Sequence, residues 1–423
     1  MAVNNAVFLK EFRQNWRILF VAFVCLLVAF SAPAFALPFL FSSVIDEYGW
    51  TREQATFLAS AKYFTGSIIA IVIGRFIDVI GVRNVLIGVT TIGGLALVSF
   101  LWVSNLTHYY LAGVMLGIAS PGTIVAIKVL ISRTFHASQG TAMGIVMLGT
   151  SLGGIIVPLT ITLLISAYGW RTATALMSSG VWLLALPLLI FFLTDKSFES
   201  ADNQDGRIEH KSSVLTWDIA KEFMGQRRFW LIAAAVFSAA FVDQAMIQHQ
   251  VLYFEVDLGL DKLYVAAGVG AMGAVAFFSR PMVGAIFDKL STRGVSLTYL
   301  ALTASCLVAL VAVSPVLFGA YVVFRAIAHS SVLLDTVVLA KHTFGLAQIG
   351  ILLGVYTAFV NLGFAFGPWF VGYMFDSTGS YVLPFLICAG IGVFAAAVLL
   401  PVRPDYWLDM RNRNRSGAST EPK

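Results

Sequence analysis

Twelve stretches of about 20 apolar residues divide the chain, beginning near residues 17, 53, 84, 108, 141, 171, 229, 264, 295, 316, 349 and 381. As a helix, each is long enough to cross the roughly 30 Å hydrocarbon core of a bilayer. The stretches are too long and too uniformly apolar for the strands of a membrane barrel. Apolar residues make up 59% of the 423 residues and charged residues 12%, which excludes a water-soluble globular domain. The sequence therefore predicts an all-α membrane protein with twelve transmembrane helices.

The chain also repeats itself at an offset of 210 residues. Each copy carries a glycine, an aspartate and an arginine at the same spacing: Gly74, Asp78 and Arg83 in the first copy, and Gly284, Asp288 and Arg293 in the second. Glycines and prolines inside the apolar stretches coincide as well: Gly153 with Gly363, and Pro158 with Pro368. The repeat indicates two fused copies of one membrane module. In transporters built from repeats, the solute site lies between the copies near the bilayer midplane.

The basic residues predict the orientation, because short loops rich in Lys and Arg stay in the cytoplasm. With the N-terminus inside, only Arg52, Arg171 and Lys262 fall on the outer side. The net charge of +5 follows from this topology and does not indicate a nucleic-acid partner. We therefore expect a multi-pass protein of a bacterial-type cytoplasmic membrane with both termini in the cytoplasm. Its predicted parts are two pseudo-symmetric six-helix bundles at residues 1–194 and 229–403, a linker at 195–228 and a tail at 404–423.

The string from Gly74 through Asp78 to Arg83 resembles the signature between the second and third helices of the major facilitator superfamily. With twelve stretches, a central polar segment and a degenerate second copy, the resemblance covers essentially the whole chain. A carboxylate at a cytoplasmic helix end can pair with a nearby arginine in one state and release it in another. The resemblance therefore implies a gating role for the glycine, aspartate and arginine of both copies.

A finer resemblance, to the monocarboxylate transporter family and its bacterial relatives, comes from three segments: residues 48–51, 135–149 and 169–171. Those relatives include oxalate/formate antiporters. The Arg280-Pro281 pair in the eighth stretch matches the arginine that anchors a carboxylate in that family, so the resemblance implies that Arg280 binds the solute. The chain departs from the family at Ala276, where proton-coupled animal members have an aspartate. It departs again at Phe359 and Asn361, where the oxalate carrier has a lysine.

Five charged side chains lie inside the predicted helices, where a charge costs at least about 2.5–3.5 kcal/mol at the helix centre: Lys62, Arg280, Arg325, Asp243 and Asp335. Three cations against two anions favour an anionic solute. Lys62 lies about ten residues, roughly 15 Å, into its stretch, too deep for its amine to reach water easily. We expect Lys62, Arg280 and Arg325 to bind the solute. The alternatives are an amine that extends outward toward water for Lys62, a structural gate pair for Arg280 and a structural ion pair for Arg325.

Three residues are candidates for proton coupling: Asp243, His329 and Asp335. A low-dielectric cavity favours the protonated form of a carboxyl group, and a nearby cation favours the ionised form. Asp243 is the best candidate to carry a coupling proton in this way. His329 lies one helical turn from Arg325 on the same face. Asp335 lies nearer the cytoplasm and has an alternative role, as the partner of a cation.

The function predicted from these observations is secondary transport of a small organic anion, a carboxylate, by alternating access. Tyr356 and Asn361 complete the predicted solute contacts, and proton symport and anion exchange both stay open. We expect a monomer in a lipid bilayer with no cofactor and no metal site. The alternatives are efflux of a larger amphipathic compound and, from another class, a non-transporting membrane sensor or membrane-embedded enzyme. That last class would need an appended soluble domain or a catalytic cluster.

Overall fold

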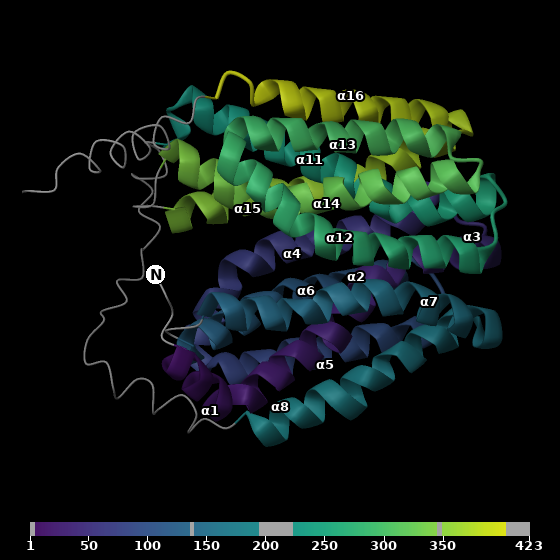
Figure 1. Ribbon diagram of the computed structural model, residues 1–423. Coiled ribbons are helices and arrows are strands. Elements are labelled where there is room, and N and C mark those ends of the chain that lie inside the picture. Colours follow the sequence, from purple (N-terminus) through teal and green to yellow (C-terminus); the bar gives the residue numbers. More distant parts are fainter. Residues whose placement is uncertain (1–4, 136–138, 194–222, 345–348, 403–423) are drawn as a thin grey trace, which may run out of the picture. The chain divides into compact units, whose positions relative to one another are not determined.

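The computed structural model describes residues 5–135, 139–193, 223–344 and 349–402, and every regular element among them is a helix (Figure 1). The helices of the first part are α1 (Asn5–Val24), η1 (Cys25–Phe30), α2 (Ser31–Phe35), α3 (Leu37–Tyr48), α4 (Arg52–Ile80), α5 (Val82–Ser99), η2 (Phe100–Trp102), α6 (Leu106–Thr134), α7 (Gln139–Gly180), η3 (Val181–Ala185) and α8 (Leu186–Phe192). Those of the second part are α11 (Arg227–Leu252), η4 (Tyr253–Asp257), α12 (Lys262–Leu290), α13 (Thr292–Val311), α14 (Pro315–Phe344), α15 (Ile349–Thr378) and α16 (Val382–Val398). Most of the predicted linker and the predicted tail lie outside the described residues.

Ten helical segments of the described chain are long and apolar enough to cross a membrane. One of them, Thr141–Phe192, has 52 residues and is interrupted at Gly169, whose φ of 76° and ψ of 161° are not helical. An apolar helix of 17 residues, α16, follows the ten. The predicted class, an all-α multi-pass membrane protein, is confirmed, whereas the exact number of twelve spans stays a prediction.

Helix α4 shows how local sequence sets the ends of these helices. At its start the Thr51 hydroxyl accepts a hydrogen bond from the Gln54 backbone N–H, and the Gln54 side chain accepts one from the Thr51 N–H. This reciprocal capping satisfies two donors that a helix start leaves open. At its end Gly81 has a φ of 85°, a conformation that glycine adopts without steric cost. Between these two signals α4 runs for 29 residues.

The chain forms two compact units. Unit 1 contains residues 1–209 and 248–274, and unit 2 contains residues 210–247 and 275–423. Residues 248–274 therefore pack with unit 1, although the repeat assigns them to the second copy. The division into bundles at residues 1–194 and 229–403 stays a prediction.

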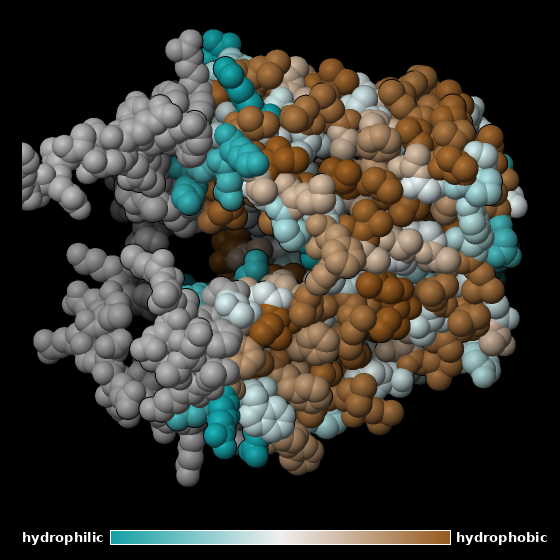
Figure 2. Space-filling model, in the orientation of Figure 1, coloured by the Kyte–Doolittle hydropathy of each residue, from teal (hydrophilic) through white to brown (hydrophobic). Residues whose placement is uncertain are grey.

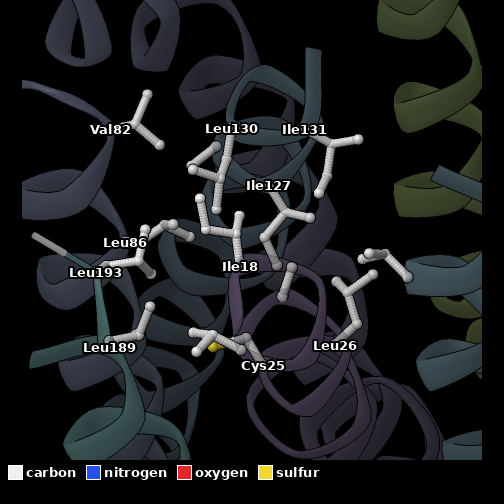
Figure 3. Close-up of a cluster of buried hydrophobic side chains, with 14 of the residues drawn as sticks. Ile18, Cys25, Leu26, Val82, Leu86, Ile127, Leu130, Ile131, Leu189 and Leu193 are labelled. Carbon is white, nitrogen blue, oxygen red and sulfur yellow. The ribbon is translucent and has the colours of Figure 1, made fainter. Parts of the chain in front are cut away.

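The core of unit 1 is built from apolar faces of α1, η1, α5, α6 and α8. Figure 3 shows Ile18, Leu26, Leu86 and Ile127 of this core pointing toward one another, and all four are buried. Cys25 lies in the same cluster, where its free thiol packs as a small apolar group. The surface is apolar too, as Figure 2 shows for the face it draws. Large exposed apolar side chains of this kind suit contact with lipid rather than water.

Repeat-related glycines bring helices close together in each unit. In unit 1, a Cβ atom on Gly153 of α7 would overlap the side chain of Ser31 in α2. In unit 2, a Cβ atom on Gly363 of α15 would overlap the backbone carbonyl of Phe237 in α11. Small residues allow this approach where helices pack in a membrane. Because residue 153 plus 210 is residue 363, the repeat seen in the sequence corresponds to a repeated helix contact.

Candidate functional site

A buried ion pair in unit 2 joins α11 to α14. Arg325 is 1% exposed and Asp243 is fully buried. The Arg325 Nη2 atom donates to the Asp243 carboxylate and, at 2.8 Å, to the Asp243 backbone carbonyl. The Nδ1 atom of His329, one turn along α14, lies 3.0 Å from the Asp243 Oδ2 atom. The Asp243 carboxylate therefore contacts one permanent cation and one titratable ring at the same time.

This arrangement favours the ion-pair interpretation of Arg325 that the sequence left open. The Arg325 Nε and Nη1 atoms are buried and have no hydrogen-bond partner among the described residues. Buried guanidinium N–H groups without a partner can still donate to an anion that reaches them. Solute binding by Arg325 thus stays a prediction, and proton coupling through Asp243 and His329 stays one as well.

Asp335 lies six residues beyond His329 on α14, roughly 9 Å along the helix axis. Its side chain is fully buried, and its Oδ2 atom accepts a hydrogen bond of 2.5 Å from the Tyr299 hydroxyl of α13. Its Oδ1 atom has no partner, and no cation of the described residues lies within ion-pair distance of it. The alternative in which Asp335 neutralises a cation therefore finds no support among these residues. Sequence reasoning missed Tyr299, because nothing in the repeat or the motifs marks it.

Lys62 lies on α4 in unit 1 and is 3% exposed. Its Nζ atom donates to the backbone carbonyl of Pro33 at 2.9 Å and lies 5.2 Å from the centre of the Tyr63 ring. Gly117 on α6 allows this part of α4 to approach closely, since a Cβ atom there would overlap the Lys62 carbonyl. Among the described residues, no carboxylate lies within ion-pair distance of the Lys62 ammonium.

The other predicted solute contacts all belong to unit 2. Arg280 of α12 is partly buried and follows Ser279, whose hydroxyl lies 2.8 Å from that of Ser330 on α14. Tyr356 of α15 is fully buried and stacks on the Phe229 ring of α11 with the ring centres 5.3 Å apart. Asn361 of α15 is partly buried. Tyr356 therefore has a packing role in this unit, and the predicted solute contacts of all three residues stay predictions.

The predicted gate residues of the first copy make two separate contacts at one end of unit 1. Asp78 forms an exposed ion pair with Arg133 of α6 at 3.0 Å, and Arg83 is not its partner. Instead, the Arg83 guanidinium donates to the backbone carbonyls of Leu193 and, at 3.1 Å, Ile190. These carbonyls end α8, where a cation is favoured by the helix dipole.

The second copy has different chemistry at the corresponding place. His342 of α14 stands where the first copy has Arg133, at an offset of 209, and its Nδ1 atom lies 2.8 Å from the Ser291 hydroxyl. Ser291 takes the place of Gly81 and, with a φ of 55°, is the only non-glycine of the described residues with a positive φ. Gly284, Asp288 and Arg293 flank this contact on α12 and α13. Their gating role stays a prediction.

Two of the segments behind the finer resemblance meet at the opposite end of unit 1. Arg171 forms an ion pair with Glu47 at 2.5 Å and donates to the Tyr48 hydroxyl. The Trp170 indole N–H also donates to Glu47, at 2.7 Å, and the Arg171 guanidinium lies 4.4 Å from the centre of the Trp170 ring. The motif residues thus tie the end of α3 to α7, which is a structural role.

A small cleft in unit 1 contains about 230 Å³ of empty space, part of it open to solvent. Hydroxyl groups from α3 and α7 line it together with one acid and one base: Ser42, Ser43, Thr162, Ser166, Glu255 and Lys262. None of the predicted site residues lines this cleft. In the described part of the chain, no group of three His, Cys, Asp or Glu side chains could hold a metal ion.

A sequence model described as Major Facilitator Superfamily matches residues 18–334 of the chain. Over 257 residues the chain is 29% identical to "MFS-type transporter 1" of Ophiocordyceps sp., a match that covers 58% of this chain and only about half, 52%, of that protein. It is 25% identical to "Probable sulfoacetate transporter SauU" of Cupriavidus necator, with 84% of this chain and 87% of that one covered. It is 24% identical to "Monocarboxylate transporter 12" of Mus musculus, with 71% and 68% covered.

The fold is also similar to that of a solved membrane protein. The crystal structure of a bacterial homolog of the human lysosomal transporter Spinster matches with a TM-score of 0.70 and covers 96% of this chain and 98% of that one. The two sequences are 16% identical, so this likeness concerns the fold alone.

Proposed function

Since the chain belongs to the major facilitator superfamily, we propose that it is a secondary transporter of a small organic anion, most simply a carboxylate. It works by alternating access, with proton symport or anion exchange as the driving reaction. In this proposal Lys62 and Arg280 bind the carboxylate, Arg325 offers a further contact, and the acidic residues of unit 2 handle a coupling proton. The protein lies in a cytoplasmic membrane with both termini inside, as the basic residues of its loops favour.

The observation that carries the proposal is the buried ammonium of Lys62. An ammonium has three N–H donors, and the one bond it makes, to the Pro33 carbonyl, leaves its charge without a counter-charge in the described part of unit 1. A buried charge is stable only when it is paired or hydrogen-bonded. A solute carboxylate would supply both the charge and the acceptors. Two relatives carry names that refer to organic anions, a sulfoacetate and a monocarboxylate.

Uptake into proteoliposomes tests the proposal. The purified protein is reconstituted and offered a panel of labelled mono- and dicarboxylates and sulfoacetate, with and without a pH gradient. We expect at least one of these anions to accumulate in the wild type, and uptake to be lost in Lys62→Met and Arg280→Gln. If none competes for uptake or protects the purified protein against heating, the anion proposal fails. Transport of an amphipathic compound that survives both substitutions would instead support efflux of a larger solute.

A further inference from the structure

We propose that Asp335, positioned by Tyr299, is the residue that carries the coupling proton, and that Asp243 serves as the permanent counter-ion of Arg325. The inference rests on the proposed function and divides its acidic residues into two roles. It also assigns a role to Tyr299, which neither the repeat nor the motifs indicate.

Asp243 is poorly suited to exchange a proton because the permanent charge of Arg325 balances its own. Arg325 donates to its carboxylate and to its backbone carbonyl, and His329 lies 3.0 Å from its other oxygen. A guanidinium does not lose its proton in a protein, so a neutral Asp243 would leave a buried cation without a partner. Removing one member of a buried ion pair is strongly destabilising. The stable state of this cluster is therefore the ionised one.

Asp335 has the opposite surroundings. It is fully buried, and its only hydrogen-bond partner among the described side chains is the Tyr299 hydroxyl of α13. The titratable groups that act on it are Tyr299 and, from α11, the negative Asp243; no cation of the described residues is within ion-pair distance. A buried carboxyl without a cation is accommodated as a neutral acid. Ionisation becomes favourable only when water or a cation reaches it, which is what a step of a transport cycle can provide.

Two pairs of buried hydroxyl groups lie on the part of α14 between His329 and Asp335. Ser331, one turn before Asp335, lies 2.6 Å from the Thr298 hydroxyl of α13. Ser330, next to His329, lies 2.8 Å from the Ser279 hydroxyl of α12. The two pairs face different helices, so each is a local polar contact of α14, one with α13 and one with α12.

Infrared difference spectroscopy on the purified full-length protein tests the assignment without any solute. The carbonyl stretch of a protonated, buried carboxylic acid is followed as pH is raised. We expect the band in the wild type, its loss in Asp335→Asn and its persistence in Asp376→Asn, a control at an exposed position of α15. Tyr299→Phe removes a donor to the ionised carboxylate, so the band should persist to higher pH. A band that survives Asp335→Asn, or no such band in the wild type, overturns the proposal.

Transport separates this inference from the proposed function. In proteoliposomes Asp335→Asn should lose accumulation driven by a pH gradient while it keeps exchange of labelled for unlabelled solute. If the wild type transports no carboxylate at all, the proposed function fails, whereas the infrared result still decides where the buried proton lies. If Asp335→Asn accumulates solute as the wild type does, Asp335 is not the carrier.

Discussion

Replacement of Lys62 by methionine distinguishes a functional charge from a structural one through the sign of its effect on stability. Methionine keeps the length of the side chain and removes the charge. The loss of the charged hydrogen bond to Pro33 costs about 1.5–3 kcal/mol. In the wild type, burial of the Lys62 ammonium, which is 3% exposed, costs several kcal/mol of lost solvation. Methionine avoids this desolvation cost, which is larger than the loss of the hydrogen bond. We therefore expect Lys62→Met to raise the free energy of unfolding by about 0–3 kcal/mol.

Thermal unfolding of the detergent-solubilised protein measures this effect, and each kcal/mol corresponds to about 2–4 °C in Tm for a unit of 150–250 residues. Lys289→Met, at an exposed lysine that ends α12, is the matched control and should change stability by less than about 0.5 kcal/mol. The same Lys62→Met protein should show no carboxylate uptake. The wild type should gain about 2.7 kcal/mol from a solute at 100 times its Kd, and the variant should gain nothing.

The opposite pattern would refute this reasoning. A Lys62→Met protein that unfolds several degrees below the Lys289→Met control, yet still takes up solute, would show that the ammonium stabilises unit 1 through its contact with Pro33. The anion proposal would then lose the observation that carries it.

Three further predictions concern the packing and the charges of the two units. Asp243→Asn should cost about 3–5 kcal/mol because it leaves Arg325 buried and unpaired, and adding Arg325→Gln should recover most of this loss in a double-mutant cycle of thermal stability. Gly363→Ala should cost about 1–3 kcal/mol through overlap with α11, while Gly354→Ala on the same helix, with open space around it, should cost nothing in the same melting experiment. Arg133→Gln breaks the ion pair with Asp78, whose side chains are 42% and 69% exposed, so the expected fall in Tm is smaller than a loss of about 1 kcal/mol would cause. A reduced uptake rate at unchanged Tm would support the gating role predicted for Asp78, and unchanged uptake would contradict it.

The repeat in the sequence was a reliable guide to packing and a poor one to chemistry. Gly153 and Gly363 occupy related helix contacts, as their offset indicates. By contrast, Arg133 forms an ion pair with Asp78 in the first copy, whereas His342, at the corresponding position of the second copy, contacts Ser291. How closely two helices approach depends on residue size, which the repeat preserves. Which side chains bond to one another depends on a few polar atoms, and a single substitution can remove or replace them.

The membrane class, the helical architecture, the family and the set of charges within the helices could all be predicted from the amino-acid sequence. These follow from runs of apolar residues and from short motifs, which are local properties of the chain. The partners of these charges became visible only in the folded structure: Asp243 contacts Arg325 and His329, and Asp335 accepts a hydrogen bond from Tyr299. It also gave Lys62 a carbonyl in place of an acid as its partner. Such pairings depend on the rotation and depth of helices that are distant in sequence, and a pattern along one helix does not specify the face of another.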